Sequence, residues 1–256
     1  MSKVPPKPPE GYDLLKTHDG SYTFFSRRYN EACHSKDGAV AETYYNFIEG
    51  CQIEKYIFQD HLCIFEVGLG LGLGYQESVK FLKSKNYQGH CLFISTEIDI
   101  NLAKWCGERD SFPELIEKKL GPLNYLHGKE EHFEIIILLG DARKSIPQVF
   151  QKLKLPKFDA IYQDAFGPTK NPALWTRQWF TDLASQTKPQ AILSTYCSST
   201  KARLALREAG FGLYPRKGFS HKRDATYALY SDPGDKALMS KLARSKVSAF
   251  CDNSLS

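Results

Sequence analysis

Short apolar runs alternate with amphipathic stretches along most of the chain. The runs are rich in β-branched and aromatic residues, which predicts buried strands at 62–67, 91–96, 133–139, 158–163, 191–196, 211–214 and 225–230. The stretches between them predict helices at 75–85, 99–108, 174–186 and 200–209. Alternation of strands and helices about every 25–30 residues is typical of a doubly wound parallel sheet, and we expect the last two strands to close it as an antiparallel pair.

The N-terminal residues and the segment 112–132 do not follow this alternation. Residues 1–11 are rich in proline and predict a mobile or extended leader. Residues 21–26 have the composition of a strand, residues 27–38 are polar and turn-rich, and residues 39–48 predict a helix. Residues 112–132 are predicted to be a less regular insertion.

A glycine-rich turn follows the strand predicted at 62–67. Gly68, Gly70 and Gly72 let the backbone leave the strand through a turn that side chains would block, and they present a helix start to a ligand. The dinucleotide fingerprint G-x-G-x-x-G would need a glycine at Leu73, so the spacing does not fit it. The observed pattern, E-x-G-x-G-x-G from Glu66, indicates a nucleoside-type cofactor such as S-adenosylmethionine. The alternative is a turn that binds no ligand.

Acidic residues stand at or next to the ends of four predicted strands, at Glu66, Glu97, Asp141 and Asp164. An open parallel sheet has its ligand site beyond these ends, so we expect the four carboxylates to face one crevice. Glu97 is expected to accept hydrogen bonds from vicinal ribose hydroxyls, and Asp141 from an exocyclic amine such as that of adenine. Glu66 is expected to brace the glycine turn or to meet the ammonium of an amino acid moiety. Each acid alone would be explained as a cap or a surface residue.

Asp164 begins the sequence D-A-F-G-P, in which glycine and proline force a tight exit from the strand. Methyl transfer to nitrogen requires an amine lone pair in line with the sulfur–methyl bond, and a carboxylate here would orient the amine and attract its proton. We therefore expect Asp164 to be catalytic and to lie against the cofactor, with Phe166 stacking on a planar base. Lys170 is expected to meet phosphate or solvent, and Tyr196 to end the fifth strand beside the crevice. The alternative is a strand-end cap followed by a core phenylalanine.

The segment 216–223 reads R-K-G-F-S-H-K-R. Lysine and arginine neutralise phosphates and an aromatic ring stacks on an unpaired base, which is typical of contacts to single-stranded RNA loops. A solvated hairpin is the alternative. The residues expected to contact substrate here are Lys217, Phe219, Lys222 and Arg223.

Composition and charge narrow the class of protein. The 256 residues suffice for one substantial core. We expect an N-terminal extension at 1–60 that packs over the cofactor and substrate site, a main domain at 61–235 and a basic tail at 236–256. The net charge is +5: residues 199–256 carry +6 and the remainder of the chain carries −1. A basic C-terminal part favours a polyanionic partner, with nucleic acid ahead of a membrane surface.

The seven cysteines are odd in number and form no C-x-x-C pair, so we expect reduced thiols and no metal site. No run approaches the about 18 apolar residues of a membrane helix, and the first ten residues contain no apolar signal core. We therefore expect a cytoplasmic protein.

Two motifs together are specific, D-A-F-x-P-x-K-N-P at 164–172 and R-K-G-F-x-x-K-R at 216–223. With the glycine turn, they make the chain from about residue 19 to residue 230 resemble the methyltransferase domain of the bifunctional bacterial enzyme that makes 5-methylaminomethyl-2-thiouridine at the tRNA wobble position, and its stand-alone relatives. Further residues that carry the resemblance are His34, Ser35, Gly38, Glu42, Gly140, Asp141, Ala142 and Trp175.

The resemblance implies a Rossmann-like, class I S-adenosylmethionine-dependent methyltransferase with a mostly parallel seven-stranded sheet and helices on both faces. It implies methyl transfer to the aminomethyl nitrogen on C5 of uridine 34 in a tRNA anticodon stem-loop, with Asp164 at the acceptor. It also implies contacts of Ser35 with substrate and of Glu42 and Ala142 with cofactor. The bifunctional form carries a second, flavin-dependent oxidase domain, for which these residues leave no room, so we expect the stand-alone form.

Other function classes remain open from the residues alone. A spermidine-synthase-like aminopropyltransferase shares the glycine turn and the strand-end acids, but its polycationic substrate calls for an acidic site mouth rather than a basic segment. A non-catalytic RNA-binding module would bind RNA without cofactor. A nicotinamide oxidoreductase is disfavoured by the glycine spacing.

Overall fold

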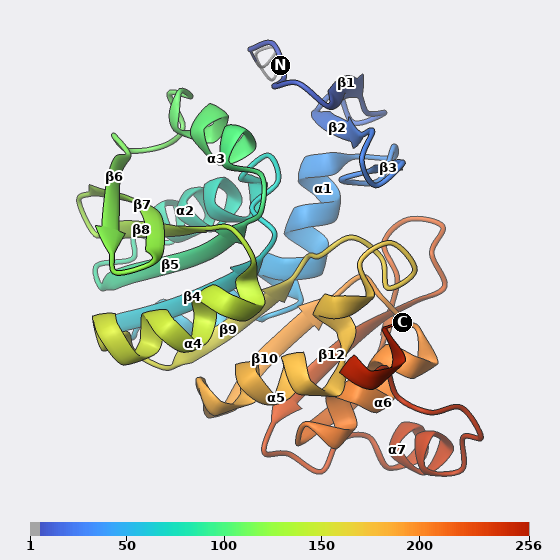
Figure 1. Cartoon of the computed structure of the whole chain (residues 1–256). Coiled ribbons are helices and arrows are strands. Elements are labelled where there is room, and N and C mark those ends of the chain that lie inside the picture. Colours follow the sequence, from blue (N-terminus) through green and yellow to red (C-terminus); the bar gives the residue numbers. More distant parts are fainter. Residues whose placement is uncertain (1–5, 256) are drawn as a thin grey trace.

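A nine-stranded sheet runs through the molecule, with helices on both of its faces (Figure 1). The computed structural model describes residues 6–255, so the first five residues of the proline-rich leader and residue 256 lie outside it. In spatial order the strands are β11 (Phe211–Lys217), β12 (Asp224–Tyr230), β10 (Thr187–Thr195), β9 (Phe158–Gln163), β4 (His61–Val67), β5 (His90–Glu97), β8 (Phe133–Leu139), β7 (Leu123–Glu130) and β6 (Ile116–Leu120).

The five strands from β10 to β8 are parallel to one another, and β12 and β11 join β10 in antiparallel fashion. This confirms the predicted doubly wound sheet and its antiparallel closing pair. The chain moves outward from β4 through β5 to β8 on one side, and from β9 to β10 on the other. The strand order therefore reverses between β4 and β9, and ligand sites of such sheets lie beyond the carboxyl ends at this point.

The prediction for residues 112–132 was wrong, because they contain the hairpin β6–β7 instead of an irregular insertion. Strand β7 pairs with β8, so the hairpin extends the expected seven strands to nine. The hairpin escaped detection because β6 is mostly exposed and charged, a composition that suits a sheet edge and gives no apolar run. Helix α4 (Ala142–Leu153), which begins directly after Asp141, was also not predicted.

Side chains alternate along the strands and fill two cores, one on each face of the sheet. On β4, for example, Ile64 belongs to one core and Phe65 to the other. The first core is covered by α1 (Ala39–Thr43), the π-helix η1 (Tyr44–Glu49), η2 (Ile53–Tyr56), α2 (Leu73–Ser84) and α3 (Ile100–Gly107). The second is covered by α4, η3 (Pro172–Trp175), α5 (Arg177–Ser185), α6 (Thr200–Glu208) and α7 (Lys236–Ala243).

A second, three-stranded sheet precedes the large one. Its strands β1 (Tyr12–Lys16), β2 (Tyr22–Ser26) and β3 (Glu31–Ala32) are antiparallel, and only the middle strand was predicted. The sheet is held against α3, where the Phe24 and Trp105 rings lie 4.9 Å apart and the Trp105 indole donates to the Lys7 carbonyl at 3.0 Å. The N-terminal segment is thereby fixed beside the carboxyl end of β5.

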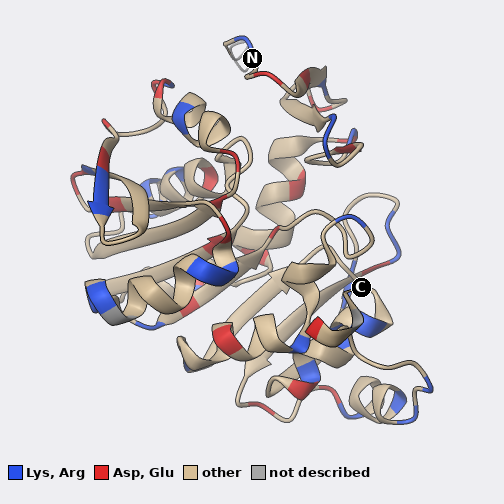
Figure 2. Cartoon of the chain, in the orientation of Figure 1, with Lys and Arg blue, Asp and Glu red and all other residues tan. Residues whose placement is uncertain are grey.

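The C-terminal segment packs on the second face of the sheet. It contains α7 and the short 3₁₀ helix η4 (Asp252–Ser254), and Asp252 pairs with Arg143 of α4. Figure 1 shows α7 at the end of the molecule opposite the small sheet, whereas the loop between β11 and β12, which carries Lys and Arg (Figure 2), lies on the side of α1 and the small sheet. Within residues 6–255, none of the helices has both the length and the apolar character needed to cross a membrane.

Candidate cofactor and acceptor site

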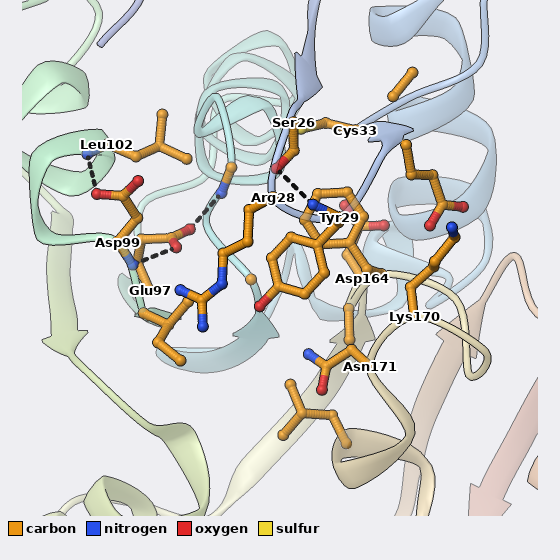
Figure 3. Close-up of a pocket in the computed structure, with 18 of the residues that line it drawn as sticks. Ser26, Arg28, Tyr29, Cys33, Glu97, Asp99, Leu102, Asp164, Lys170 and Asn171 are labelled. Atoms are coloured by element: carbon orange, nitrogen blue, oxygen red, sulfur yellow. Dashed lines mark hydrogen bonds between the residues drawn. The ribbon is translucent and has the colours of Figure 1, made fainter. Parts of the chain in front are cut away.

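A cavity of about 540 Å³ lies beyond the carboxyl ends of the central strands, and the small sheet forms its outer wall (Figure 3). This is where the strand order reverses, as expected for an open sheet. The predicted site residues that line it are Ser35, Glu42, Gly68, Gly70, Glu97, Asp141, Ala142, Asp164, Phe166, Lys170, Tyr196 and Lys222. The predicted residues that are not part of its lining are Glu66, Gly72, Lys217, Phe219 and Arg223.

The glycine turn needs its glycines for conformation and for space. Gly68, Gly70 and Gly72 have φ angles of +87°, +53° and +70°, in the left-handed region that side chains rarely adopt. A Cβ atom on Gly68 would lie 3.2 Å from the Asp164 carbonyl oxygen, and one on Gly72 would lie 2.3 Å from the Phe112 ring. Gly68 and Gly70 therefore keep the turn close to the cavity, while Gly72 makes room for packing behind it.

Glu97 connects the glycine turn to the start of α3. Its side chain is buried, with Oε2 accepting from the Gly70 N–H at 3.1 Å and Oε1 from the Asp99 N–H at 2.9 Å (Figure 3). Burial raises the pKa of Glu97 to about 7, against the lowering effect of these two backbone donors. Each carboxylate oxygen retains acceptor capacity on the cavity side, because an ionised carboxylate accepts about four hydrogen bonds.

Glu66 lies deeper than predicted. It is 1% exposed, its Oε2 accepts from the Ser95 hydroxyl at 2.7 Å, and a Cβ atom on Gly74 would lie 1.8 Å from its Oε1. Burial raises the pKa of Glu66 to about 8. The structure thus places this carboxyl group under the first turn of α2 instead of on the cavity wall.

Asp141 combines a capping role with a place at the cavity. Its Oδ1 accepts from the Arg143 N–H at 3.0 Å and caps α4, and its side chain is exposed. Ala142, the first residue of the helix, is buried and also lines the cavity.

Asp164 lies on the wall opposite Glu97 (Figure 3). Burial, followed by the negative charges of Glu66 and Glu42, raises the pKa of Asp164 well above its usual range, and Lys222 opposes this effect. The Lys222 ammonium group is paired with Glu42 Oε1 at 2.7 Å, so the loop between β11 and β12 is tied to α1 next to Asp164.

Glu42 has a second contact, because its Oε2 accepts from the Ser35 N–H at 2.5 Å. Both carboxylate oxygens of this buried residue are therefore engaged within the protein. Its role in the structure is to join three segments, the loop after β3, helix α1 and the β11–β12 loop.

Aromatic side chains close the cavity around Asp164. Phe166 stacks on Tyr29 with ring centroids 4.3 Å apart, so one face of its ring is covered by Tyr29. The Tyr196 hydroxyl donates to the Ala165 carbonyl at 2.7 Å, and Lys222 lies over the Tyr196 ring at 5.1 Å. Tyr196 thereby fixes the tight turn that follows β9.

The other predicted RNA-contacting residues lie outside the cavity. Lys217 is exposed at the end of β11 and Arg223 is exposed in the loop before β12, where the Phe219 ring packs against Tyr45 at 5.9 Å. The Tyr45 hydroxyl also donates to the Lys217 carbonyl at 2.8 Å, which anchors this loop on η1.

Sequence reasoning missed most of the outer wall. Additional lining residues are Tyr12, Arg28, Tyr29, Glu31, Cys33, His34 and Asn171. Burial and the negative charges of Glu97 and Asp99 raise the pKa of Tyr12, which shows how closely β1 approaches the second strand end. For the residues between 28 and 34, the composition of 21–38 indicated the segment but not the individual side chains. His34 and Asn171 also belong to the residues that carry the family resemblance, but they had no assigned role at the site, and nothing in the sequence indicated Tyr12.

The chain is similar to known proteins in sequence and in structure. Residues 110–231 match a family model described as S-adenosyl-L-methionine-dependent methyltransferase. The chain is 29% identical over 237 residues to the tRNA 5-methylaminomethyl-2-thiouridine biosynthesis bifunctional protein MnmC of Leptospira interrogans, a match that covers 85% of this chain and 35% of that protein. An uncharacterised protein of Methanocaldococcus jannaschii is 27% identical over 234 residues, covering 89% of this chain and 62% of that protein.

The chain spans about a third of the length of the bifunctional relatives it matches. The crystal structure of MnmC2 from Aquifex aeolicus is similar, with a TM-score of 0.76 and 27% identity, covering 96% of this chain and 79% of that chain. This similarity confirms the predicted methyltransferase fold class and the resemblance to MnmC-type proteins. The family description also agrees with the predicted cofactor, S-adenosylmethionine.

Proposed function

Because this chain is related to the S-adenosyl-L-methionine-dependent methyltransferases of the MnmC type, we propose that it methylates the aminomethyl nitrogen of 5-aminomethyl-(2-thio)uridine at tRNA position 34. The observation that carries the proposal is that Asp164 and Glu97 line opposite sides of one cavity. We assign Asp164 to the acceptor and Glu97 to the cofactor. The relatives give no support to an aminopropyltransferase or to a non-catalytic module.

The residues present fit the cofactor. The cavity volume of about 540 Å³ is within the range of small-molecule sites. Gly68 and Gly70 allow a ligand to approach the backbone closely, Glu97 offers acceptors for ribose hydroxyls, and Asp141 offers one for an amine. When bound, the cofactor supplies an electrophilic methyl group on a sulfonium and leaves as a neutral thioether.

Asp164 is proposed to take the proton of the acceptor. A primary amine is mostly an ammonium ion at neutral pH and has no lone pair until it loses a proton. The raised pKa of Asp164, caused by burial and then by Glu66 and Glu42, makes its carboxylate a stronger base than an ordinary aspartate. With S-adenosylmethionine bound, the freed lone pair would form the new C–N bond, and the electron pair of the broken S–C bond would stay on sulfur. Positioning supplies most of the rate.

The β11–β12 loop is proposed to hold the RNA. Lys222 and Lys170 both line the cavity and are exposed. Lys217, the last residue of β11, and Arg223 are exposed near Lys222 in the sequence. Together these cations would neutralise phosphates of an RNA whose nucleotide enters the cavity.

The experiment is incubation of the protein with labelled S-adenosylmethionine and tRNA that lacks the final methyl group, followed by nucleoside analysis. We expect label in the methylaminomethyl side chain of uridine 34. Label in another nucleoside, or in no nucleoside, would contradict the proposed substrate.

A further inference from the structure

Glu31 is a lining residue of the cavity for which sequence reasoning found no role. It begins the two-residue strand β3, which pairs with the end of β2 at Ser26. Its Oε2 atom is buried and has no hydrogen-bond partner among the described residues. Within residues 6–255, no Lys, Arg or His forms a salt bridge with it either. A buried carboxylate oxygen without a partner is costly, so its retention on a cavity wall points to a ligand.

The surroundings of Glu31 place it near the proposed acceptor position. A Cβ atom on Gly167 would lie 3.7 and 3.9 Å from the two Glu31 carboxylate oxygens and 3.9 Å from the Tyr196 hydroxyl. Glu31 and Asp164 both act electrostatically on Tyr196 and on Cys33, so the two carboxylates lie on the same part of the cavity wall. Gly167 belongs to the turn that begins at Asp164.

The neighbouring polar groups do not satisfy Glu31. The Tyr196 hydroxyl donates its proton to Ala165, and Lys222 is paired with Glu42. The partner that Glu31 lacks is therefore a donor, and a cationic donor is favoured next to the negative charge of Asp164. An ammonium group meets both conditions.

We propose that Glu31 binds the acceptor amine through an N–H···O hydrogen bond, and that it selects RNA carrying an aminomethyl group over RNA without one. This inference rests on the proposed function of the cavity. A primary ammonium has three N–H groups, and one of its protons passes to Asp164. The neutral amine keeps two N–H groups, which donate to Glu31 and to the unprotonated oxygen of Asp164, so its lone pair is left free in the third direction. Glu31 exchanges no proton in this scheme.

The test uses two anticodon stem-loop RNAs that differ only at position 34, one with 5-aminomethyluridine and the other with uridine. Their dissociation constants are measured by fluorescence anisotropy in the presence of S-adenosylhomocysteine. We expect the unaltered protein to bind the aminomethyl RNA more tightly than the uridine RNA. In Glu31→Gln the ratio of the two dissociation constants should fall about tenfold, since a hydrogen bond between two charged groups is among the stronger ones. Affinity for the uridine RNA should not change.

Two further variants separate charge from structure. Glu31→Asp keeps the carboxylate and should restore part of the preference, while Glu117→Gln removes an exposed carboxylate on β6 and should change nothing. In methyl transfer, Glu31→Gln should raise KM for the RNA about tenfold with a smaller effect on kcat. Equal preference in the unaltered protein and Glu31→Gln, or equal weakening toward both RNAs, would overturn the role of Glu31. A preserved preference without methyl transfer would overturn the proposed function instead.

Discussion

At the scale of single residues, the site consists of carboxylates whose depth in the structure decides what they do. Glu97 is the last residue of β5 and lines the cavity. Glu66 of β4 pairs with Ser95, which lies two residues before Glu97 on β5, and its carboxyl group lies under α2. The sequence predicts that acids stand at strand ends. It does not predict the pairing register of β4 and β5, in which Glu66 lies two residues short of Glu97, and this offset separates a wall residue from a buried one.

Replacement of Asp164 by asparagine tests the acceptor role. The amide keeps the shape of the side chain but accepts no proton, so we expect kcat to fall by about 10²–10⁴-fold. The dissociation constant of S-adenosylhomocysteine, measured by calorimetry, should stay within about twofold, because Asp164 lies on the wall opposite Glu97. Turnover equal to that of the unaltered protein would remove the assigned role.

The pKa of Glu97, about 7 because of burial, makes cofactor binding dependent on pH. Ribose hydroxyls donate to the ionised carboxylate, so binding favours the charged form and lowers the pKa. We therefore expect the affinity for S-adenosylhomocysteine to be weak at pH 6, to rise through pH 7 and to level off above it. Glu97→Gln should bind more weakly with little pH dependence over this range. A flat profile for the unaltered protein would contradict the assignment of Glu97 to the ribose.

At the scale of elements, the glycine turn shows how local and tertiary requirements combine. The three glycines were predicted from their spacing alone, but only the structure shows that they differ. Gly70 has open space around its Cα, whereas Gly72 faces the buried Phe112 ring, which packs on Tyr75 at 5.1 Å. Phe112 precedes the hairpin β6–β7 and comes from a segment that was predicted to be irregular.

Alanine substitutions at these two glycines should therefore have different costs. Gly70→Ala introduces only an unfavourable backbone conformation, which destabilises by about 1–2 kcal/mol. Gly72→Ala adds an overlap with the Phe112 ring worth about 1–3 kcal/mol more. Chemical denaturation of both variants without cofactor measures this difference. Equal losses of stability would show that Phe112 moves aside without cost.

The parts of the fold that can be predicted from the sequence are those with a strong periodicity of apolar residues. Buried parallel strands and the helices between them have long apolar patterns, and the predicted bounds agree with β5, β8 and β9 within about one residue. The small sheet and β6 lack such patterns, because β1 and β3 are only partly buried and β6 is mostly exposed. The outer wall of the cavity comes from this weakly patterned N-terminal segment, which explains why Tyr29 and Glu31 were missed.

At the scale of the whole molecule, positive charge gathers where the cavity opens and also at the opposite end. The β11–β12 loop reaches the cavity through Lys222, while α7 lies at the end of the molecule away from the small sheet (Figures 1 and 2). Sequence composition assigns both to one basic region. The structure separates them, and only the β11–β12 loop is close enough to the cavity to hold a nucleotide that enters it.

This separation gives a test with an internal control. A double variant with Lys217→Ala and Arg223→Ala removes two exposed cations, one at each end of the β11–β12 loop. A second variant with Lys241→Ala and Arg244→Ala removes two exposed cations near the end of α7. Both change the net charge by the same amount. Because each phosphate contact contributes about 0.7–0.9 to the slope of log K against log salt concentration, the loop variant should reduce that slope for tRNA by about 1.4–1.8.

The α7 variant should leave the slope nearly unchanged, since local contacts and not the overall charge set it. Equal slopes for the two variants, measured by anisotropy from 50 to 200 mM salt, would assign RNA binding to the general field of the protein and not to the loop beside Asp164.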